Sequence, residues 1–161
     1  MNVAFIGGGV MGEAMVRGLL ARGTAQAAEL VVSDISPERR QHLEAQYHVP
    51  TTSDNKVSLS RGDVVVLAVK PEALGQVMAE LKGRLQARQL ALSIVAGATL
   101  EGLTSGLGHE AVVRAMPNIP AQIGQAITLW TATPQVGQAQ LEQATAILEA
   151  LGRQLYVADE K

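Results

Sequence analysis

Short apolar runs alternate along the chain with longer segments in which apolar residues recur every three or four positions. This alternation predicts strands and helices in turn, arranged as a mostly parallel sheet with helices on both faces. Several runs are apolar at every position, as expected of strands buried on both sides. Residues 63–69 are the clearest of these and should lie near the middle of the sheet. The predicted strands cover residues 3–6, 30–33, 63–69, 90–95, 112–116, 127–131 and 155–157, with a short one near 49–52.

Helix starts are marked by proline and capping residues. Ser36-Pro37-Glu38 places an N-cap residue, a first-turn proline and an acid in order, and Pro71-Glu72 repeats the pattern after the central strand. The second of these helices has an apolar face formed by Leu74, Met78, Leu81 and Leu85. A last helix is expected after Pro134, with Leu141, Ala144, Leu148 and Leu151 on one face and Gly152 at its end.

The segment after the first strand is the strongest local signal. Gly7, Gly9 and Gly12 match the pattern G-x-G-x-x-G between a buried strand and a helix, which is the context that dinucleotide binding requires. Gly7 allows the tight turn, Gly9 lets the backbone approach a pyrophosphate, and Gly12 lets the helix pack close to the strand. The helix N-terminus adds N–H groups and the positive end of its dipole. The alternative is a glycine-rich turn without a ligand.

An acidic residue stands where a dinucleotide site needs one. Asp34 lies 22 residues after Gly12, at the end of the second predicted strand, where a carboxylate can hold the ribose 2′-hydroxyl. A carboxylate there repels a 2′-phosphate and therefore favours NAD(H) over NADP(H). Arg39 and Arg40 lie close enough to counter this effect. The alternative is that Asp34 only caps the turn before the next helix.

Composition excludes several classes of protein. The 161 residues fit one domain, the absence of cysteine excludes disulfides and thiolate chemistry, and three scattered histidines argue against a zinc site. A net charge of −2 without a basic run argues against nucleic acid. No apolar stretch has the length of a membrane helix, and no signal peptide is evident, so we expect a cytoplasmic protein. The low charged fraction, 17%, suggests that part of the surface is covered, unless it reflects a bias in composition.

Three further segments follow predicted strands. They are Val69-Lys70-Pro71, residues 93–98 (SIVAGA) and residues 114–121 (RAMPNIPA). Together with the first turn they resemble the N-terminal domain of pyrroline-5-carboxylate reductase, a family that reduces a cyclic imine to proline with NAD(P)H. The resemblance covers essentially the whole chain, and RAMPNIPA is its most specific part. It implies a Rossmann-like, doubly wound α/β fold, an NAD(H)- or NADP(H)-dependent reductase of proline biosynthesis, and a small imine as substrate.

The resemblance also assigns roles to residues at the strand ends. Ala68 through Pro71 would line the ribose and nicotinamide side, Ala96 and Gly97 would leave room for a flat ring, Met116 through Asn118 would hold the nicotinamide face, and Asn55 would contact the adenosine part. The residues predicted to bind the cofactor are Gly7, Gly9, Val10, Met11, Gly12, Asp34, Ser36, Asn55, Ala68, Val69, Lys70, Pro71, Ala96, Gly97, Met116, Pro117 and Asn118. We predict no metal ligand and no catalytic residue, because the nearest acid–base candidates, Glu13, His109 and Glu110, are expected on the surface.

Two departures from the family qualify this interpretation. The family often has a basic residue for the 2′-phosphate where this chain has Ile35, which agrees with a preference for NAD(H). Its second, helical domain, which binds the substrate carboxylate and forms the dimer, would begin shortly after Lys161 and is not in this sequence. We therefore expect residues 1–161 to form a dinucleotide-binding domain that is inactive alone and self-associates. A non-catalytic nucleotide-binding module, or the cofactor domain of a 3-hydroxyacid dehydrogenase, remain as alternatives.

Overall fold

The computed structural model describes residues 1–118 and 126–160. The strands are β1 (Val3–Ile6), β2 (Leu30–Ser33), β3 (Thr51–Thr52), β4 (Val64–Leu67), β5 (Leu90–Ser93), β6 (Val112–Pro117), β7 (Ala126–Ala132) and β8 (Gly152–Tyr156). The helices are α1 (Val10–Ala21), α2 (Pro37–Tyr47), α3 (Asn55–Ser60), α4 (Pro71–Leu81), α5 (Leu100–Leu107) and α6 (Gln138–Glu149), with a 3₁₀ turn at Ala27–Glu29.

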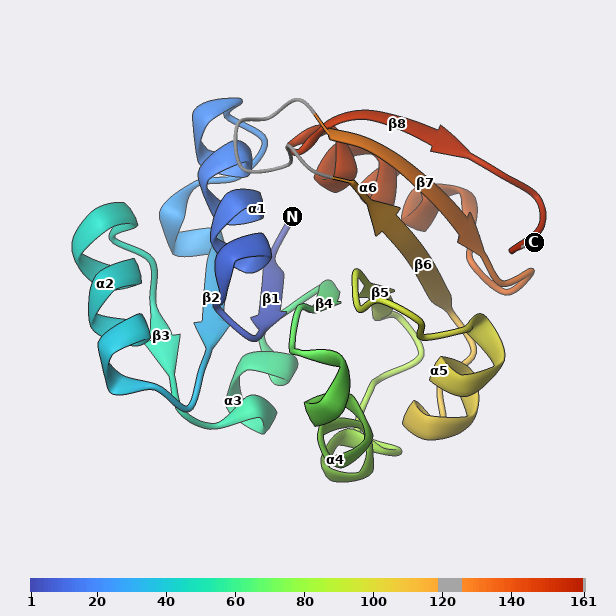
Figure 1. Ribbon diagram of the computed structural model, residues 1–161, viewed down its shortest axis with the longest axis horizontal. Helices are drawn as coiled ribbons and strands as arrows, with labels where there is room; N and C mark the ends of the chain where they lie inside the picture. Colours follow the sequence, from blue (N-terminus) through green and yellow to red (C-terminus); the bar gives the residue numbers. More distant parts are fainter. Residues whose placement is uncertain (119–125, 161) are drawn as a thin grey trace.

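The strands form one sheet in the order β3-β2-β1-β4-β5-β6-β7-β8 (Figure 1). Strands β1 to β6 pair in parallel, β7 is antiparallel to β6, and β8 is parallel to β7. Strand β4 is central, as its continuous apolar run predicts, and its four residues are all buried. The chain leaves β1 toward β2 on one side and returns to β4 on the other, so the strand order reverses beside β1. In an open α/β sheet, ligands bind at such a reversal.

Helices cover both faces of the sheet, so the predicted doubly wound α/β fold is confirmed (Figure 1). On one face, α1, α2 and α6 pack on the sheet through residues such as Met15, Leu43 and Ile147. On the other face, α3, α4 and α5 form a second core that includes Leu59 and Leu81. The parallel strands are buried on both sides because each face has its own helical layer.

Several predicted boundaries are corrected by the structure. Leu85 lies beyond the end of α4, and Leu151 lies beyond the end of α6. Gly152 does not close the last helix: it opens β8, with φ 138°. The strand expected at residues 63–69 is shorter, because Ala68 and Val69 already belong to the turn into α4. The end of the RAMPNIPA string, residues 119–121, lies outside the described residues.

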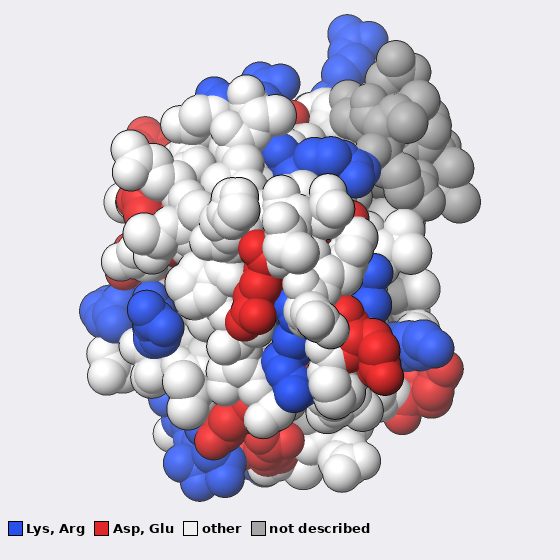
Figure 2. Space-filling model, turned by 90° about the vertical axis from the view of Figure 1, so that its left-hand side faces the viewer, with Lys and Arg blue, Asp and Glu red and all other residues white. Residues whose placement is uncertain are grey.

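Two further expectations concern membrane-spanning helices and a nucleic-acid-binding surface. No described helix combines the length and apolarity needed to cross a bilayer. On the face that includes α2, acidic and basic side chains are interspersed among large uncharged areas (Figure 2). The described residues of this face therefore form no continuous basic surface of the kind that binds a phosphate backbone.

Candidate functional site

The carboxyl ends of the parallel strands lie in one row. The registers pair Ile6 with Ser33 and Leu67, and Leu67 with Ser93. The segments that follow these strands therefore start at the same edge of the sheet, which we call the rim. Strand β6 extends past the level of Ser93, since Ser93 pairs with Arg114, three residues before the end of β6. All the predicted cofactor-binding segments thus begin on the rim.

The three glycines of the motif have different steric surroundings. Gly7 has φ 104°, and a Cβ there would lie 2.6 Å from the Ala68 carbonyl oxygen. A Cβ on Gly12 would lie 2.7 Å from the Gly7 carbonyl oxygen, so this glycine lets α1 pack on the turn. Gly9 is different, because a Cβ there would meet no atom within 4 Å. The protein itself does not need a glycine at Gly9, whereas a ligand that approaches the backbone does.

Gly9 also marks the start of α1. It is the N-cap residue, in an extended conformation with no capping side chain. The first N–H groups of a helix have no partner within the helix, so those of Val10, Met11 and Gly12 are donors at its positive end. Val10 is 62% exposed. An anion placed here would meet backbone donors and open space, and these are the features that suit a pyrophosphate.

Asp34 has both carboxylate oxygens engaged within the protein. One accepts a hydrogen bond from Gly8 N at 2.9 Å, and the other accepts one from Ser36 N at 2.8 Å. Asp34 therefore caps the turn before α2, and the same side chain also holds the glycine-rich turn against the end of β2. Binding of a ribose hydroxyl by Asp34 stays a prediction. The hydroxyl of Ser36 is engaged as well, since it caps α2 by accepting from Arg39 N at 3.2 Å.

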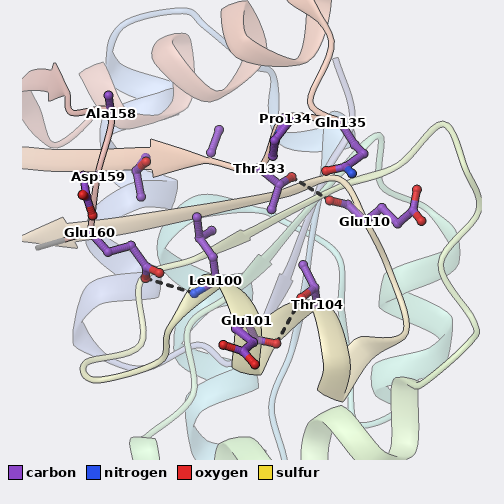
Figure 3. Close-up of a pocket in the computed structure, with 12 residues that line it drawn as sticks. Leu100, Glu101, Thr104, Glu110, Thr133, Pro134, Gln135, Ala158, Asp159 and Glu160 are labelled. Carbon is purple, nitrogen blue, oxygen red and sulfur yellow. Dashed lines mark hydrogen bonds between the residues drawn. The ribbon is translucent and has the colours of Figure 1, made fainter.

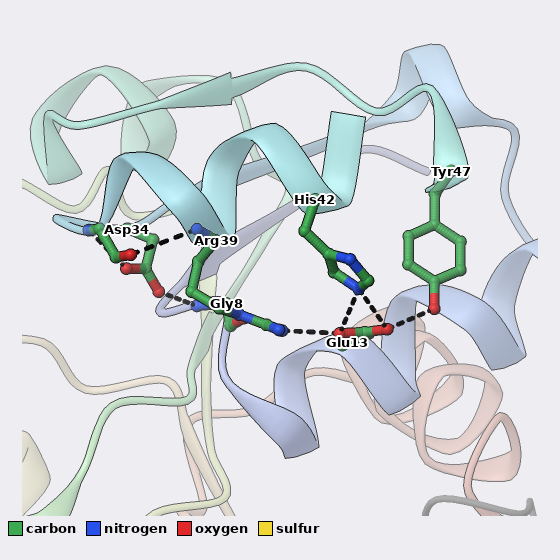
Figure 4. A network of polar contacts seen from close by, with 7 residues as sticks. Gly8, Glu13, Asp34, Arg39, His42 and Tyr47 are labelled. Atoms are coloured by element: carbon green, nitrogen blue, oxygen red, sulfur yellow. Dashed lines mark hydrogen bonds and ion pairs between the residues drawn. The ribbon is translucent and has the colours of Figure 1, made fainter. Parts of the chain in front are cut away.

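A polar network joins the first turn to α2 (Figure 4). Glu13 accepts hydrogen bonds from Arg39 and Tyr47, both at 2.6 Å, and its carboxylate lies 3.1 Å from His42 Nε2. Arg39 also donates to the Gly8 carbonyl oxygen, from Nε at 2.9 Å and from Nη2 at 2.6 Å. Burial raises the pKa of Glu13, but hydrogen bonds from Tyr47, His42 and Arg39 outweigh it and lower the pKa to about 2. Glu13 is therefore ionised at neutral pH.

The remaining predicted segments differ in their exposure. Ala68 packs on the glycine turn, Lys70 and Pro71 are exposed at the start of α4, and Ala96 and Gly97 are exposed after β5. Gly97 has φ 80°, and a Cβ there would meet no atom within 4 Å, so this turn is both tight and open. Met116 and Pro117 are partly buried, and Asn118 is exposed with its side-chain oxygen accepting from Ile127 N at 2.9 Å. The oxygen of the Asn118 amide is thus bound to β7.

The expectation that the acid–base candidates lie on the surface is wrong for His109, and Glu13 is only partly exposed. Glu13 is held in the network described above, with a side chain only 17% exposed. His109 is buried and lies 2.6 Å from the Gln89 carbonyl oxygen, before β5 and β6 and so away from the rim. Glu110 is exposed, as predicted. Glu13, which is partly buried, and His109, which is buried, both bind protein partners, so they do not form an acid–base pair.

A hollow of about 630 Å³ lies elsewhere, between α5, the end of β7 and the segment after β8 (Figure 3). Its lining includes four acidic residues, Glu101, Glu110, Asp159 and Glu160. Glu160 is tied to the fold by Arg114 Nη1 at 2.6 Å and Leu100 N at 3.0 Å. An acidic lining repels a pyrophosphate, so this hollow does not fit the phosphate part of a dinucleotide.

Comparison with known proteins identifies the family. Residues 2–97 match the family model described as "NADP oxidoreductase coenzyme F420-dependent". The chain belongs to this family. The matched region of this oxidoreductase family member contains the first turn, Asp34, Asn55, the segment from Ala68 to Pro71, and the turn at Ala96 and Gly97.

The more similar relatives are named pyrroline-5-carboxylate reductases, which confirms the predicted resemblance. The chain is 37% identical to the one from Synechocystis and 38% identical to the one from Pseudomonas aeruginosa, in each case over 99% of this chain. The solved structure of a pyrroline-5-carboxylate reductase from Coxiella burnetii is 34% identical and matches 99% of this chain with a TM-score of 0.94. The chain spans only 58–59% of the length of these three relatives.

Two residues of this oxidoreductase domain were missed as parts of the turn. A Cβ on Gly8 would lie 2.7 Å from Leu43 Cδ1 and 2.9 Å from Val32 Cγ1, so the middle one of the three consecutive glycines also packs where a side chain would clash. Arg39 was considered in the sequence only as a residue that could counter the effect of Asp34 on a 2′-phosphate, but its guanidinium binds the turn itself. The run of three glycines is the sequence signal for Gly8, whereas no local pattern indicates the partner of Arg39.

Proposed function

We propose that this chain binds NAD(P)H at the rim and supplies the cofactor side of a reductase that converts 1-pyrroline-5-carboxylate to proline. The observation that carries the proposal is the similarity to proteins of that name over almost the entire chain, at 34–38% identity. The geometry supports it independently, because the unobstructed backbone at Gly9 adjoins the N-terminus of α1. The cofactor supplies the hydride that reduces the C=N carbon, while the imine nitrogen gains a proton.

The residues of this chain have positioning roles in the proposal. The first turn and α1 hold the pyrophosphate, the β2 side holds the adenosine part, and the segments after β4, β5 and β6 hold the nicotinamide side. The described rim offers no acid–base pair, and a protonated imine is already electrophilic. Rate enhancement therefore depends on orientation, which requires the substrate to be held as firmly as the cofactor.

The proposed preference is for NADH. In this proposal the Asp34 carboxylate lies beside the adenosine ribose. Ile35 is 88% exposed at the position where a cation would be needed to bind a 2′-phosphate. Arg39 and Arg40 are near, but Arg39 binds Gly8 and Glu13, and Arg40 donates to the Asp34 carbonyl oxygen at 2.7 Å. Binding an additional phosphate would compete with these contacts.

We also propose that the chain alone does not complete the active site. Its relatives are longer by roughly two fifths of their length, and the family's substrate-carboxylate loop is expected in that part. Calorimetric titration with NADH and NADPH tests the cofactor role. A second assay compares reduction of pyrroline-5-carboxylate by this chain and by a fusion to the unmatched part of the Synechocystis relative.

The expected result is cofactor binding by both proteins and turnover by the fusion alone. Binding without turnover by either protein would favour a non-catalytic nucleotide-binding module. Equal turnover by both would place the carboxylate site within residues 1–161.

A further inference from the structure

A buried serine, Ser33, forms a hydrogen bond with Asn55, one of the residues predicted to bind the cofactor. Ser33 is the last residue of β2 and is fully buried. Its hydroxyl donates to Asn55 Oδ1 at 2.7 Å. Asn55 is the first residue of α3, which Asp54 caps by accepting from Lys56 N at 2.9 Å. The hydrogen bond therefore links the end of β2 to the side chain that α3 presents beside the rim.

The Ser33 hydroxyl has two possible acceptors, and the neighbouring Ser58 hydroxyl indicates which of them it donates to. Ser33 Oγ also lies 3.2 Å from the Phe5 carbonyl oxygen, and Ser58 Oγ lies 3.2 Å from the same oxygen. Each hydroxyl has one proton to donate. Ser58 is fully buried and has the Phe5 carbonyl as its described acceptor, so its proton belongs there. The proton of Ser33 then goes to the closer acceptor, Asn55 Oδ1.

This arrangement fixes the polarity of the Asn55 amide. Its oxygen is occupied by Ser33, so the NH₂ group, with two donors, is the end that is left for other partners. Asn55 is only partly buried, so these donors are accessible. An asparagine without such a contact could present either end, and binding would then have to select one orientation.

We propose that Ser33 is a positioning residue that makes Asn55 a hydrogen-bond donor toward the ligand. The proposal rests on the proposed dinucleotide binding and specifies the ligand atom: an acceptor, such as a ribose or phosphate oxygen, in the adenosine half. The half follows from position, because Ser33 precedes Asp34 at the end of β2, the strand whose end faces the adenosine ribose in such folds.

Three variants distinguish an effect of the Asn55 amide orientation on binding from a general loss of stability. Asn55→Asp replaces the NH₂ group by an oxygen, still accepts from Ser33, and places an acid in the first turn of α3, where it is favourable. Ser33→Ala removes the hydroxyl that orients the amide. Ser58→Ala is the matched control, since it removes an equally buried hydroxyl from the same carbonyl without touching Asn55.

The probe is ADP-ribose, titrated calorimetrically into the full chain, with thermal unfolding of each variant recorded alongside. Ser33→Ala should weaken binding about three- to tenfold, and Asn55→Asp about tenfold or more. Ser58→Ala should lower the unfolding temperature about as much as Ser33→Ala does and leave the affinity within about twofold. In an Asn55→Ala background, Ser33→Ala should weaken binding no further, because Ser33 acts through Asn55.

Other results would overturn the proposal. Unchanged or tighter binding by Asn55→Asp would mean that Asn55 faces the ligand with its oxygen. Equal losses in Ser33→Ala and Ser58→Ala would mean that the serines matter only for the fold. If the unmodified chain bound neither ADP-ribose nor NADH, the proposed function itself would fail, an outcome distinct from binding that these variants leave unchanged.

Discussion

At the scale of single residues, the proposed preference for NADH rests on two neighbours, Asp34 and Ile35, whose side chains differ in their contacts. The Asp34 carboxylate is held by Gly8 and Ser36, whereas Ile35 is 88% exposed and packs on nothing that a substitution would disturb. Ile35→Arg should therefore fold normally and raise the affinity for NADPH relative to NADH by about tenfold, the scale of one charge-assisted hydrogen bond. The ratio of the two dissociation constants measures this, with Ile35→Gln as the control. An unchanged ratio would show that the 2′-position lies elsewhere, and tighter NADPH binding by the unmodified chain would show that Arg39 or Arg40 dominates.

Side-chain contacts between residues far apart in the sequence could not be predicted, whereas local steric roles could. The roles of Gly7 and Gly12 could be predicted because the motif is local and each glycine answers to sterics within a few residues. The contact between Gly8 and Asp34 spans 26 residues, so no local pattern reveals that the carboxylate is already engaged. The Asn55 amide likewise receives its orientation from Ser33, which is 22 positions away in the sequence.

At the scale of elements, Glu13 connects α1 to α2, and its contribution to stability should depend on pH. Its pKa in the folded protein, about 2, lies below the ordinary value of 4.5. Its stabilising effect is therefore present above pH 4.5 and is lost as the pH falls toward 2. We expect the free energy of unfolding to fall by about 1–2 kcal/mol more between pH 7 and pH 3 in the unmodified chain than in Glu13→Gln.

Urea unfolding at the two pH values measures this difference, and Glu142→Gln, at an exposed position on α6, is the control. Parallel pH profiles for the unmodified chain and Glu13→Gln would contradict the assignment. A drop for the unmodified chain that Glu13→Gln lacks and Glu142→Gln retains would support it.

Elements were predicted best where proline and capping residues mark them, as at α2 and α4. Helix α3 was missed because six residues are too few for an apolar period to appear. Periodicity also placed Leu85 and Leu151 on helices that end before them, since an apolar residue after a helix can pack on the same core. The direction of β7 depends on the connection after β6, whose length and composition do not determine whether the chain reverses.

At the scale of the whole molecule, apolar side chains on β7 and β8 are exposed in the described part of the sheet. Ile127, Leu129 and Leu155 are 50%, 40% and 56% exposed, and Leu129 pairs directly with Leu155. These residues lie on β7 and β8, the last two strands at one edge of the sheet. An exposed apolar surface of this kind favours association. We expect the chain to self-associate through it.

Sedimentation velocity across a range of concentrations tests this expectation. Leu129→Thr combined with Leu155→Thr keeps strand-forming residues and should shift the chain toward monomer. Val57→Gln removes an exposed apolar side chain from α3 and should not. Equal association by all three proteins would contradict a role for β7 and β8.

The central claim is that the first turn binds a dinucleotide, and Gly9→Val tests it most directly. Gly9 has an extended backbone, with φ −76°, that valine also adopts, and open space around the added side chain, so the variant should unfold at the same temperature as the unmodified chain. Gly75→Val is the matched control, because Gly75 also has open space but lies within α4. Calorimetric titration should detect NADH binding to the unmodified chain and to Gly75→Val, and none to Gly9→Val. A folded Gly9→Val protein with unchanged NADH affinity would contradict the account.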